Sequence, residues 1–364
     1  MKPRFLIDAK ITAGREYLSE LGVSQPYDPA DLQETELDGV LGLICRTTTP
    51  VGPSLIARAP HLQFVATASA GHDHLDLEAL RSRGISWCSA PGCNASAVAD
   101  YTLTAIFRLM EQMRMSRNAR IGVVGVGHVG GEVVRRCNAV GLQVHPCDPP
   151  LAAAGQVPAG SDAAETHAFA PLSELLRRCD LLTFHVPLTH GGPHPTAGLL
   201  QPHHLSESSV KGLINTARGG VVLAAECAAL PTAPLQVIDV WAREPAPDPR
   251  LLRAPSVLMA TPHVAGYGAA AKWAATAQLV PQIAAFLGVP PPAVPSYVPA
   301  HTPTLVVGHH PTRGLPSTAK ILTRLLGLED RDRELRAAAA EPPNTRAERF
   351  RRLRSVPPFR VEFA

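Results

Sequence analysis

One glycine-punctuated stretch, from Arg120 to Pro150, constrains the fold of this 364-residue chain more than any other feature. It opens with a short apolar run, Ile121 to Val124, whose β-branched residues favour a buried parallel strand. A G-x-G-x-x-G turn, a helical stretch from Val129 to Val140 and a second apolar run from Leu142 to Cys147 follow. This order of strand, turn, helix and strand predicts a βαβ unit of a parallel sheet.

The three glycines of the turn are the residues that a bound dinucleotide requires. Gly125 allows a tight turn, Gly127 lets backbone N–H groups approach a pyrophosphate, and Gly130 lets helix and strand pack closely. Asp148 lies 18 residues after Gly130, where a carboxylate accepts hydrogen bonds from an adenosine ribose and repels an added 2′-phosphate. We therefore expect NAD rather than NADP, with a plain structural turn as the alternative.

Composition limits the remaining classes of protein. With 45% hydrophobic residues, the chain can bury the cores of two or three soluble domains. A net charge of +3 gives no reason to expect a nucleic acid as partner. Seven cysteines without a C-x-x-C pair argue against a disulfide framework or a zinc ribbon and favour a cytoplasmic protein. No apolar run has the length of a signal peptide or a membrane span, so no membrane is expected.

Alternating strands and helices on both sides of the glycine turn predict two α/β domains. Long helical stretches at 96–117 and 269–287 are expected to cross between them, which makes the first domain discontinuous. A Pro-rich run, Gly288 to Pro295, indicates a stiff linker to a small C-terminal module. The expected domains are a substrate domain (1–95 and 270–287), a nucleotide domain (96–269), and a linker with the C-terminal module (288–364). In that module we expect a strand at Thr304–Val307 and helices at Ser317–Gly327 and Arg346–Arg354.

Three polar side chains follow predicted strands, at the sheet edge where open parallel sheets bind ligands. Arg218 can direct two N–H donors at a substrate carboxylate. His263 can take or return a proton near neutral pH, and Glu244 beside it would favour the imidazolium. An anchor, a base and an orienter for the base are what the oxidation of a 2-hydroxy acid needs. A surface arginine, a surface acid and a strand-end histidine are the alternatives.

Several motifs resemble those of the D-2-hydroxyacid dehydrogenase family. In chain order they are Gly125-Val-Gly-His-Val-Gly130, Asn215-Thr-Ala-Arg218-Gly, Asp239-Val-Trp with Glu244-Pro, and Thr261-Pro-His263. Further stretches are similar to the branch of that family that acts on 4-phospho-D-erythronate: Ala90-Pro-Gly-Cys-Asn-Ala95, Cys147-Asp-Pro-Pro150, Thr183-Phe-His-Val-Pro-Leu188 and His263-Val-Ala-Gly-Tyr267. The tail, with Phe350-Arg-Arg-Leu-Arg and Arg360-Val-Glu-Phe, resembles a C-terminal dimerisation module.

The resemblance implies a fold and a reaction. The expected fold is a Rossmann-type doubly wound parallel sheet, a second, flavodoxin-like α/β substrate domain, and a small module that forms a homodimer. The expected reaction is the NAD-dependent oxidation of a small phosphorylated 2-hydroxy acid, 4-phospho-D-erythronate, to 2-oxo-3-hydroxy-4-phosphobutanoate in pyridoxal phosphate (vitamin B6) biosynthesis. Two alternatives stay open: a dehydrogenase for another D-2-hydroxy acid, such as phosphoglycerate or glyoxylate, and a catalytically impaired, NAD-binding regulatory relative.

The resemblance also implies roles for individual residues. His263 would be the acid and base, Glu244 would hold and polarise it, and Arg218 would bind the substrate carboxylate. The cofactor contacts would be Gly125, Gly127, His128, Val129, Gly130, Asp148, His185, Val186, Pro187, Thr216, Ala217, Asp239 and Gly266. The substrate contacts would be Thr47, Ser69, Ala70, Gly71 and Tyr267. Arg46 beside Thr47 makes a phosphate site physically sensible, because hydroxyl and cationic donors suit a phosphate, and a surface arginine is the alternative. No metal is expected, because His72 and His74 lack further ligands.

The chain departs from the family pattern mainly in the loops after Arg218. Leu223 stands where an aspartate is usual, and Pro231 and Pro234 shorten the helix that follows. The stretch 206–212 is also trimmed, and Ala9-Lys10 replaces a more acidic pair. Because a misplacement of about 1 Å can lower a rate by roughly 100-fold, these changes are the reason to keep the impaired relative as an alternative.

Overall fold

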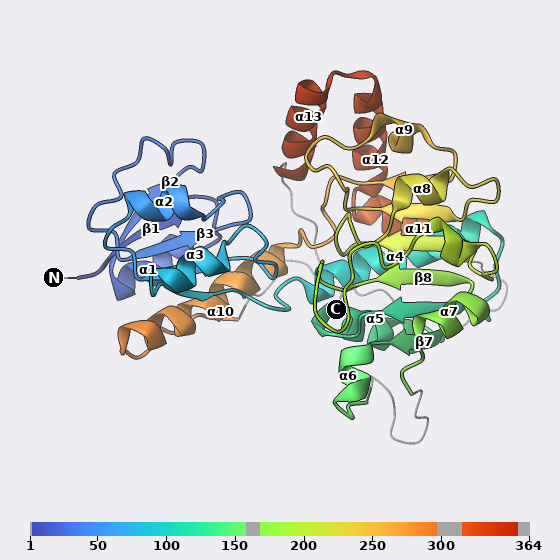
Figure 1. The fold of residues 1–364 in the computed structure, drawn as a ribbon, viewed down its shortest axis with the longest axis horizontal. Helices are drawn as coiled ribbons and strands as arrows, with labels where there is room; N and C mark the ends of the chain where they lie inside the picture. The colour runs from blue at the N-terminus through green and yellow to red at the C-terminus, as the bar shows by residue number, and fades with distance from the viewer. Residues whose placement is uncertain (1, 158–167, 297–314, 356–364) are drawn as a thin grey trace. The chain divides into compact units, whose positions relative to one another are not determined.

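The computed structural model of the chain describes residues 2–157, 168–296 and 315–355 (Figure 1). The chain divides into two compact units, and each contains its own parallel sheet. Unit 1 comprises Met1–Asn94 with Gly268–His301, and unit 2 comprises Ala95–Tyr267 with Thr302–Ala364. The predicted class, α/β with two parallel sheets, is confirmed. The strand predicted at Thr304–Val307 lies outside the described residues.

The sheet of unit 1 has the strand order β2-β1-β3-β4-β5, and all of its strands run parallel. This is the flavodoxin-like order 2-1-3-4-5. The strands are β1 (Arg4–Asp8), β2 (Val23–Tyr27), β3 (Gly42–Cys45), β4 (Phe64–Thr67) and β5 (Ser86–Cys88). Because successive side chains of a strand point to opposite faces, Phe5 and Ile7 belong to one apolar cluster and Leu6 to another.

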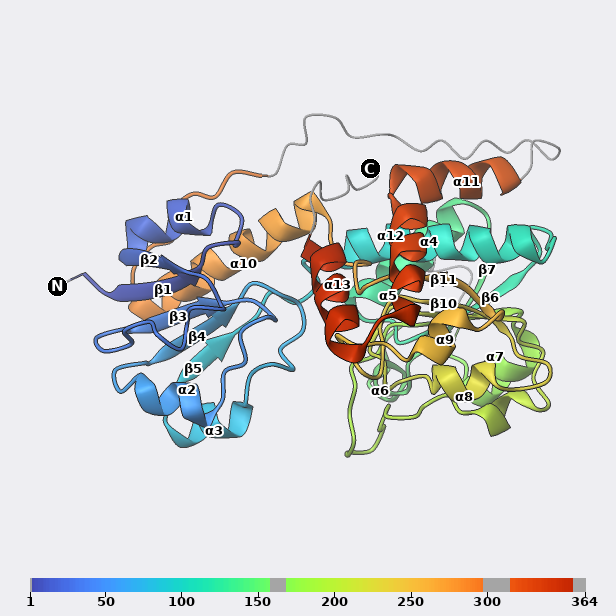
Figure 2. The ribbon, with the colours of Figure 1, turned by 90° about the horizontal axis from the view of Figure 1, so that it is seen from above.

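Helices cover both faces of this sheet, as Figure 2 shows. On the face of Phe5 and Ile7 lie α1 (Gly14–Leu21) and α10 (Ala269–Leu287). On the face of Leu6 lie α2 (Pro53–Arg58) and α3 (Leu77–Ser82). With both faces covered, the carboxyl ends of the strands are the edge that can present polar side chains to a ligand.

The sheet of unit 2 has the order β11-β10-β9-β8-β6-β7, again all parallel. The strands are β6 (Arg120–Val124), β7 (Gln143–Cys147), β8 (Leu181–Phe184), β9 (Gly212–Asn215), β10 (Leu235–Ile238) and β11 (Val257–Ala260). β8 and β9 are buried throughout, as near-continuous apolar strands of a covered parallel sheet are. The direction of the chain through the sheet reverses between β6 and β8, which is the point at which open parallel sheets bind ligands.

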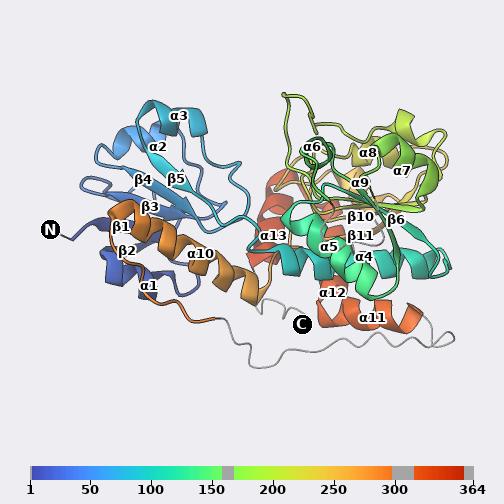
Figure 3. The ribbon, with the colours of Figure 1, turned by 90° about the horizontal axis from the view of Figure 1, so that it is seen from below.

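Helices also cover both faces of the second sheet (Figure 3). α4 (Ala95–Gln112), α5 (His128–Ala139) and α11 (Leu315–Leu325) share one apolar cluster, whereas α7 (Leu172–Arg178) packs on the other face. Arg136 of α5 joins α4 by an ion pair with Asp100 and by a 2.7 Å hydrogen bond to Ser96 Oγ. The remaining short helices of this part are α6 (Pro149–Ala153), η1 (Pro202–Leu205), α8 (Ala224–Ala228) and α9 (Pro249–Arg253).

The C-terminal helices pack on unit 2. After α11 come α12 (Leu328–Ala337), η2 (Ala338–Ala340) and α13 (Pro343–Ser355). α12 lies against β11, because Asp332 accepts the N–H of Ala260 at 2.6 Å and Arg336 donates to the carbonyl of Val257 at 2.7 Å. Phe350 and Leu353 of α13 are buried in the same apolar cluster as residues of β10 and β11. These helices thus shield the β11 edge of the sheet.

Two elements carry little hydrophobic signal in the sequence and were not predicted. β2 reads Val-Ser-Gln-Pro-Tyr, and only Tyr27 of it is buried. It is an edge strand, where a proline is tolerated. α12 is mostly charged and buries only Leu328 and Leu335.

Within the described ranges, no helix combines the length and the apolar character needed to cross a membrane.

Candidate active site

The glycine turn between β6 and α5 has the backbone that the G-x-G-x-x-G pattern predicts. Gly125 adopts φ +84°, a left-handed conformation that favours glycine. A Cβ on Gly130 would lie 1.8 Å from the carbonyl oxygen of Gly125, so only glycine allows α5 to pack this closely on the turn. A Cβ on Gly127 would meet no atom within 4 Å. The space above Gly127 and the N-terminus of α5 can therefore accept an anion such as a pyrophosphate.

Asp148 ties the strand after α5 to the glycine turn. Its Oδ2 accepts the N–H of Val126 at 2.7 Å, and its Oδ1 accepts the N–H of Leu151 at 3.1 Å as the N-cap of α6. A carboxylate has about four lone-pair positions, so two remain for the hydroxyls of a ribose. The glycine turn and Asp148 together fit NAD, as the sequence predicts.

His185, at the end of β8, forms the neighbouring wall of the glycine turn. A Cβ on Gly125 would lie 2.9 Å from the His185 carbonyl carbon and 2.6 Å from Val186 Cγ1. Both ring nitrogens of His185 have hydroxyl partners, Thr183 at 3.0 Å and Thr216 at 3.2 Å. Burial lowers the pKa of His185 to about 3. The imidazole is therefore neutral at physiological pH and serves as a fixed, uncharged surface beside the turn.

Hydrogen bonds between its own residues hold the loop that carries Arg218. The Asn215 side chain donates to the carbonyl of Arg218 at 3.0 Å and accepts the N–H of Ala217 at 3.1 Å. Arg218 Nη1 donates to the carbonyl of Ala217 at 2.8 Å. A Cβ on Gly219 would lie 2.0 Å from the carbonyl carbon of Trp241. Close packing at Gly219 thus fixes the Arg218 loop against the segment that leads to Glu244.

Asp239 organises the segment that carries His263. Its carboxylate is fully buried and accepts three hydrogen bonds: from the Thr261 hydroxyl at 2.7 Å and from the N–H groups of Val264 and Ala265 at 2.8 Å each. The N–H of His263 donates to the Asp239 carbonyl at 2.7 Å. His263 itself adopts φ +56°, an uncommon conformation for a residue with a side chain. A buried, triply bonded carboxylate can hold such a backbone in place.

His263 and Glu244 form a hydrogen-bonded pair. His263 Nδ1 donates to Glu244 Oε2 at 2.8 Å, and the other carboxylate oxygen accepts the N–H of Trp241 at 2.9 Å. Burial opposes ionisation of Glu244, but the His263 hydrogen bond and charge, the Trp241 N–H and the charge of Arg354 together hold its pKa below the ordinary value. Glu244 is therefore ionised, and the Nε2 of His263 is left as the nitrogen that can exchange a proton with a ligand.

Unit 1 holds the other predicted substrate residues. Arg46 lies at the end of β3, and its Nε is 2.9 Å from Oδ2 of Asp8, a fully buried carboxylate. Asp8 therefore offsets the charge of Arg46. Thr47, next to it, is exposed and can donate a hydrogen bond outward. Ala70 and Gly71 are half-buried in the loop after β4.

Ser69 belongs to a chain of hydrogen bonds whose direction can be deduced. The Ser69 hydroxyl donates its one hydrogen to the carbonyl of Gly71 at 2.7 Å. Thr67 Oγ1, 2.8 Å away, must therefore be the donor to Ser69, and His74 Nε2, at 2.9 Å, must be the donor to Thr67. Ser69 consequently presents an acceptor, rather than a donor, to a ligand.

The ring of the neighbouring His72 lies beside that of Trp87, with 4.9 Å between the ring centroids and 43° between the ring planes. Across the described part of the chain, no group of three or more histidine, cysteine or acidic side chains has a geometry that would hold a metal.

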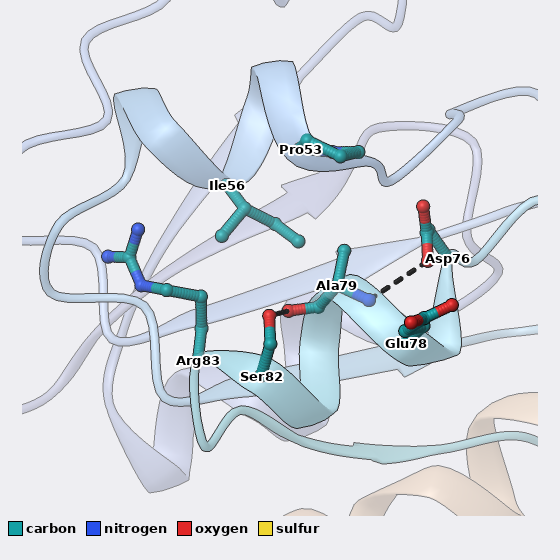
Figure 4. A pocket seen from close by; sticks show the side chains of 7 residues that line it. All are labelled: Pro53, Ile56, Asp76, Glu78, Ala79, Ser82 and Arg83. Carbon is teal, nitrogen blue, oxygen red and sulfur yellow. Dashed lines mark hydrogen bonds between the residues drawn. The ribbon is translucent and has the colours of Figure 1, made fainter.

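A hollow of about 430 Å³ on unit 1 lies apart from these residues (Figure 4). Its polar groups hold helix α3: Asp76 accepts the N–H of Ala79, and the Ser82 hydroxyl donates to the Ala79 carbonyl, both at 2.9 Å. The lining residues are Pro53, Ile56, Asp76, Glu78, Ala79, Ser82 and Arg83. None of the site residues predicted from the sequence lines this hollow.

The remaining predicted site residues lie in unit 2, at the start of α5 or in the loops that follow the strands. The cofactor contacts among them are His128, Val129, Pro187, Ala217 and Gly266, and their roles stay predictions. Tyr267 follows Gly266, and the guanidinium carbon of Arg354 lies 5.4 Å from the centre of its ring. Sequence reasoning missed Thr183, Asn215 and Arg354. Thr183 forms a hydrogen bond with His185, and Asn215 forms hydrogen bonds with Ala217 and Arg218, close by in the chain. Arg354 comes from α13, far away in the sequence, and no motif signals its position.

Known proteins resemble the chain in sequence and fold. Residues 104–265 match the family model of the D-isomer specific 2-hydroxyacid dehydrogenase, NAD binding domain. The erythronate-4-phosphate dehydrogenase of Salinibacter ruber is 37% identical over 78% of this chain and 72% of its own length. That of Pseudoalteromonas atlantica is 31% identical over 96% of this chain and 90% of its own length.

Solved structures give the same fold. The TT0316 protein of Thermus thermophilus superposes with a TM-score of 0.64 at 26% identity, covering 79% of this chain and 98% of its own. An NAD+-bound 3-phosphoglycerate dehydrogenase of Entamoeba histolytica, at 18% identity, shares the fold with a TM-score of 0.64 over 79% of this chain and 96% of its own. The chain belongs to the erythronate-4-phosphate dehydrogenases, within the D-isomer-specific 2-hydroxyacid dehydrogenase family.

Proposed function

We propose that the protein oxidises 4-phospho-D-erythronate at its C2 hydroxyl, with NAD as the acceptor, to 2-oxo-3-hydroxy-4-phosphobutanoate. The observation that supports this most is the 2.8 Å His263–Glu244 pair, in a chain 37% identical to an erythronate-4-phosphate dehydrogenase. An intact pair also speaks against the catalytically impaired alternative. The product is a precursor for pyridoxal phosphate, as the resemblance implies.

The chemistry of the chain's own residues follows from the protonation of the pair. Glu244 is ionised and accepts the Nδ1 hydrogen of His263, so that Nε2 can take the proton of the C2 hydroxyl. Glu244 then stabilises the imidazolium that forms. The buried Asp239 carboxylate keeps the His263 loop in one position during this transfer.

The glycine turn and Asp148 would hold NAD. When bound, NAD supplies the acceptor for the hydride that leaves C2. Gly127 and the N-terminus of α5 would face its pyrophosphate, and Asp148 its adenosine ribose. Neutral His185 adds no charge beside the glycine turn.

The predicted substrate residues offer both hydrogen-bond donors and an acceptor. Arg218 binds the substrate carboxylate through its forked N–H donors. Ser69 presents an acceptor and so suits a substrate hydroxyl rather than a phosphate oxygen, whereas Thr47 can donate. A substrate with a hydroxyl next to its reacting carbon fits this pattern.

The experiment that tests the substrate is a comparison of initial rates of NADH formation. We expect kcat/KM to be highest for 4-phosphoerythronate, lower for unphosphorylated erythronate and lower for 3-phosphoglycerate. NADP in place of NAD should support a much lower rate, since Asp148 repels a 2′-phosphate. A preference for 3-phosphoglycerate would contradict the proposed substrate.

The protein also acts as a homodimer in the cytoplasm, in our proposal. Support for the dimer comes from α11, whose Ile321 and Leu325 are 53% and 54% exposed, one helical turn apart. Monomers rarely leave neighbouring apolar side chains exposed in this way unless the surface has a partner. The cytoplasmic location is supported by the metabolic dehydrogenases that the chain resembles.

A further inference from the structure

The C-terminal helix α13 brings a cation to the catalytic loops of unit 2. Phe350 and Leu353 anchor the helix, with 1% and 5% of their surfaces exposed, in an apolar cluster that also contains Trp241. The backbone N–H of Trp241 in turn donates to Glu244. Arg354 follows Leu353 directly, and its guanidinium carbon lies 5.4 Å from the centre of the Tyr267 ring.

Arg354 differs from Arg336 and Arg349, whose side chains have hydrogen-bond or ion-pair partners. Arg336 donates to two carbonyls, and Arg349 forms an ion pair with Glu341. Within 2–157, 168–296 and 315–355, Arg354 forms no ion pair, and its Nε, like those of Arg331 and Arg346, is buried without a hydrogen-bond partner. Buried donors in native proteins nearly always have a partner. A ligand that brings acceptors would complete this side chain.

The charge balance of the chain favours Arg354 over Arg46 as the residue that meets a phosphate. Arg46 lies 2.9 Å from the fully buried carboxylate of Asp8, which offsets its charge. Ser69 offers an acceptor, which a phosphate oxygen would repel. Arg218 is needed for the carboxylate at the other end of the substrate. Arg354 has a fork of donors that matches phosphate geometry, and no carboxylate forms an ion pair with it among the described side chains.

We propose that Arg354, with Tyr267 beside it, binds the phosphate group of the substrate. The inference rests on the proposed function, because it takes the substrate to carry a phosphate. It gives the C-terminal helices a part in substrate selection, in addition to any contact between subunits. The Pseudoalteromonas relative aligns over 96% of this chain, so most of the C-terminal segment is shared with a dehydrogenase named for a phosphorylated substrate.

The test compares Arg354→Gln and Arg354→Lys with the wild type, and Arg351→Gln as the matched control. Arg351 is an exposed arginine of the same helix. Each protein is assayed with 4-phosphoerythronate and with unphosphorylated erythronate. We expect Arg354→Gln to raise KM for 4-phosphoerythronate about 10- to 100-fold, the range for losing a charge-assisted hydrogen bond. The kcat for that substrate and the kcat/KM for erythronate should stay within about 3-fold of the wild type.

Arg354→Lys keeps the positive charge but loses the paired N–H donors of the guanidinium. The KM of this variant for 4-phosphoerythronate should therefore lie between those of the wild type and Arg354→Gln. Arg351→Gln should behave as the wild type. An equal loss with both substrates, or no loss with either, would overturn the proposal. An equal loss would mean that Arg354 acts only through Glu244 or through the fold.

A second measurement separates this proposal from the proposed function. If the wild type oxidises no phosphorylated 2-hydroxy acid, the proposed function fails, and calorimetric titration of the full-length protein with inorganic phosphate then tests Arg354. Phosphate binding that is lost in Arg354→Gln and kept in Arg351→Gln supports the proposal. Equal phosphate binding by the two variants contradicts it.

Discussion

Gly127 and Gly130 stand three residues apart in the same turn, yet the two positions tolerate a side chain very differently. A Cβ on Gly130 would collide with the carbonyl of Gly125, whereas a Cβ on Gly127 would point into open space. Gly130 is thus required by the fold, whereas Gly127 is required by the ligand that approaches the turn. This difference can be measured.

We predict that Gly130→Ala destabilises the protein by about 2–4 kcal/mol, because backbone must move to relieve the collision. Gly127→Ala should leave the thermal midpoint nearly unchanged but weaken NADH binding at least about 10-fold, since the methyl group would occupy the space for a pyrophosphate. Thermal melts and fluorescence titration with NADH measure the two effects. NADH affinity that survives in a folded Gly127→Ala variant would contradict the cofactor site.

His185 makes folding stability depend on pH. Its folded-state pKa of about 3 lies below the value of about 6.5 in an unfolded chain. Below pH 6.5 the unfolded state therefore binds a proton that the folded state does not. Stability is fully present above pH 6.5 and is lost as the pH falls towards 3, by at most about 1.4 kcal/mol per pH unit.

His185→Gln, which cannot take up a proton, should remove this part of the acid sensitivity. We expect the thermal midpoint of the variant to fall less steeply than that of the wild type between pH 6.5 and 4, where both remain folded. The Thr183 and Thr216 hydroxyls still have an amide partner in the variant, so its stability at pH 8 should change little. Parallel pH profiles for the two proteins would show that His185 is not the group responsible.

At the scale of elements, α8 begins without a side-chain hydrogen bond that caps its N-terminus. Its N-cap is Leu223, which makes no side-chain hydrogen bond, and Glu226 occupies the third helical position. A serine at 223 would complete the capping box, in which Ser and Glu bond each other's backbone N–H groups. With Leu223 at this position, α8 is therefore less stable, next to the Arg218 loop, than it would be with a capping residue.

Leu223→Ser should stabilise the protein by about 1 kcal/mol, seen as a higher denaturation midpoint in urea. Leu223→Ala is the control, because it removes the same apolar atoms without adding a cap. If Leu223→Ser were no more stable than Leu223→Ala, the missing cap would not be what weakens this helix.

The elements that position the site were largely predictable from the sequence. β6, β10 and β11 carry strong apolar patterns, and parallel strands end at one edge of a sheet whatever their separation in sequence. For this reason Glu244 and His263 could be expected near each other. Arg354 could not, because the position of its helix depends on how Phe350 and Leu353 pack. β2 and α12 escaped prediction because edge strands and charged surface helices lack a clear hydrophobic period.

At the scale of the whole molecule, the exposed apolar face of α11 predicts a subunit contact. Replacing Ile321 and Leu325 together by glutamate should convert a dimer to a monomer, because burying two carboxylates costs several kcal/mol. Light scattering after gel filtration measures the mass. Val23→Glu, at a residue of β2 that is 55% exposed, is the control and should leave the mass unchanged. A double variant with the mass of a dimeric wild type would place the contact elsewhere.

The central claim, that His263 and Glu244 act together in NAD-dependent oxidation, is tested most directly by kcat for 4-phosphoerythronate in His263→Asn, Glu244→Gln and the double variant. Asparagine is chosen because it tolerates the left-handed backbone of His263. We predict a fall of about 100- to 10,000-fold for His263→Asn, no further fall when Glu244→Gln is added, and NADH affinity within about 3-fold of the wild type. Turnover close to the wild-type rate in folded His263→Asn would contradict the account.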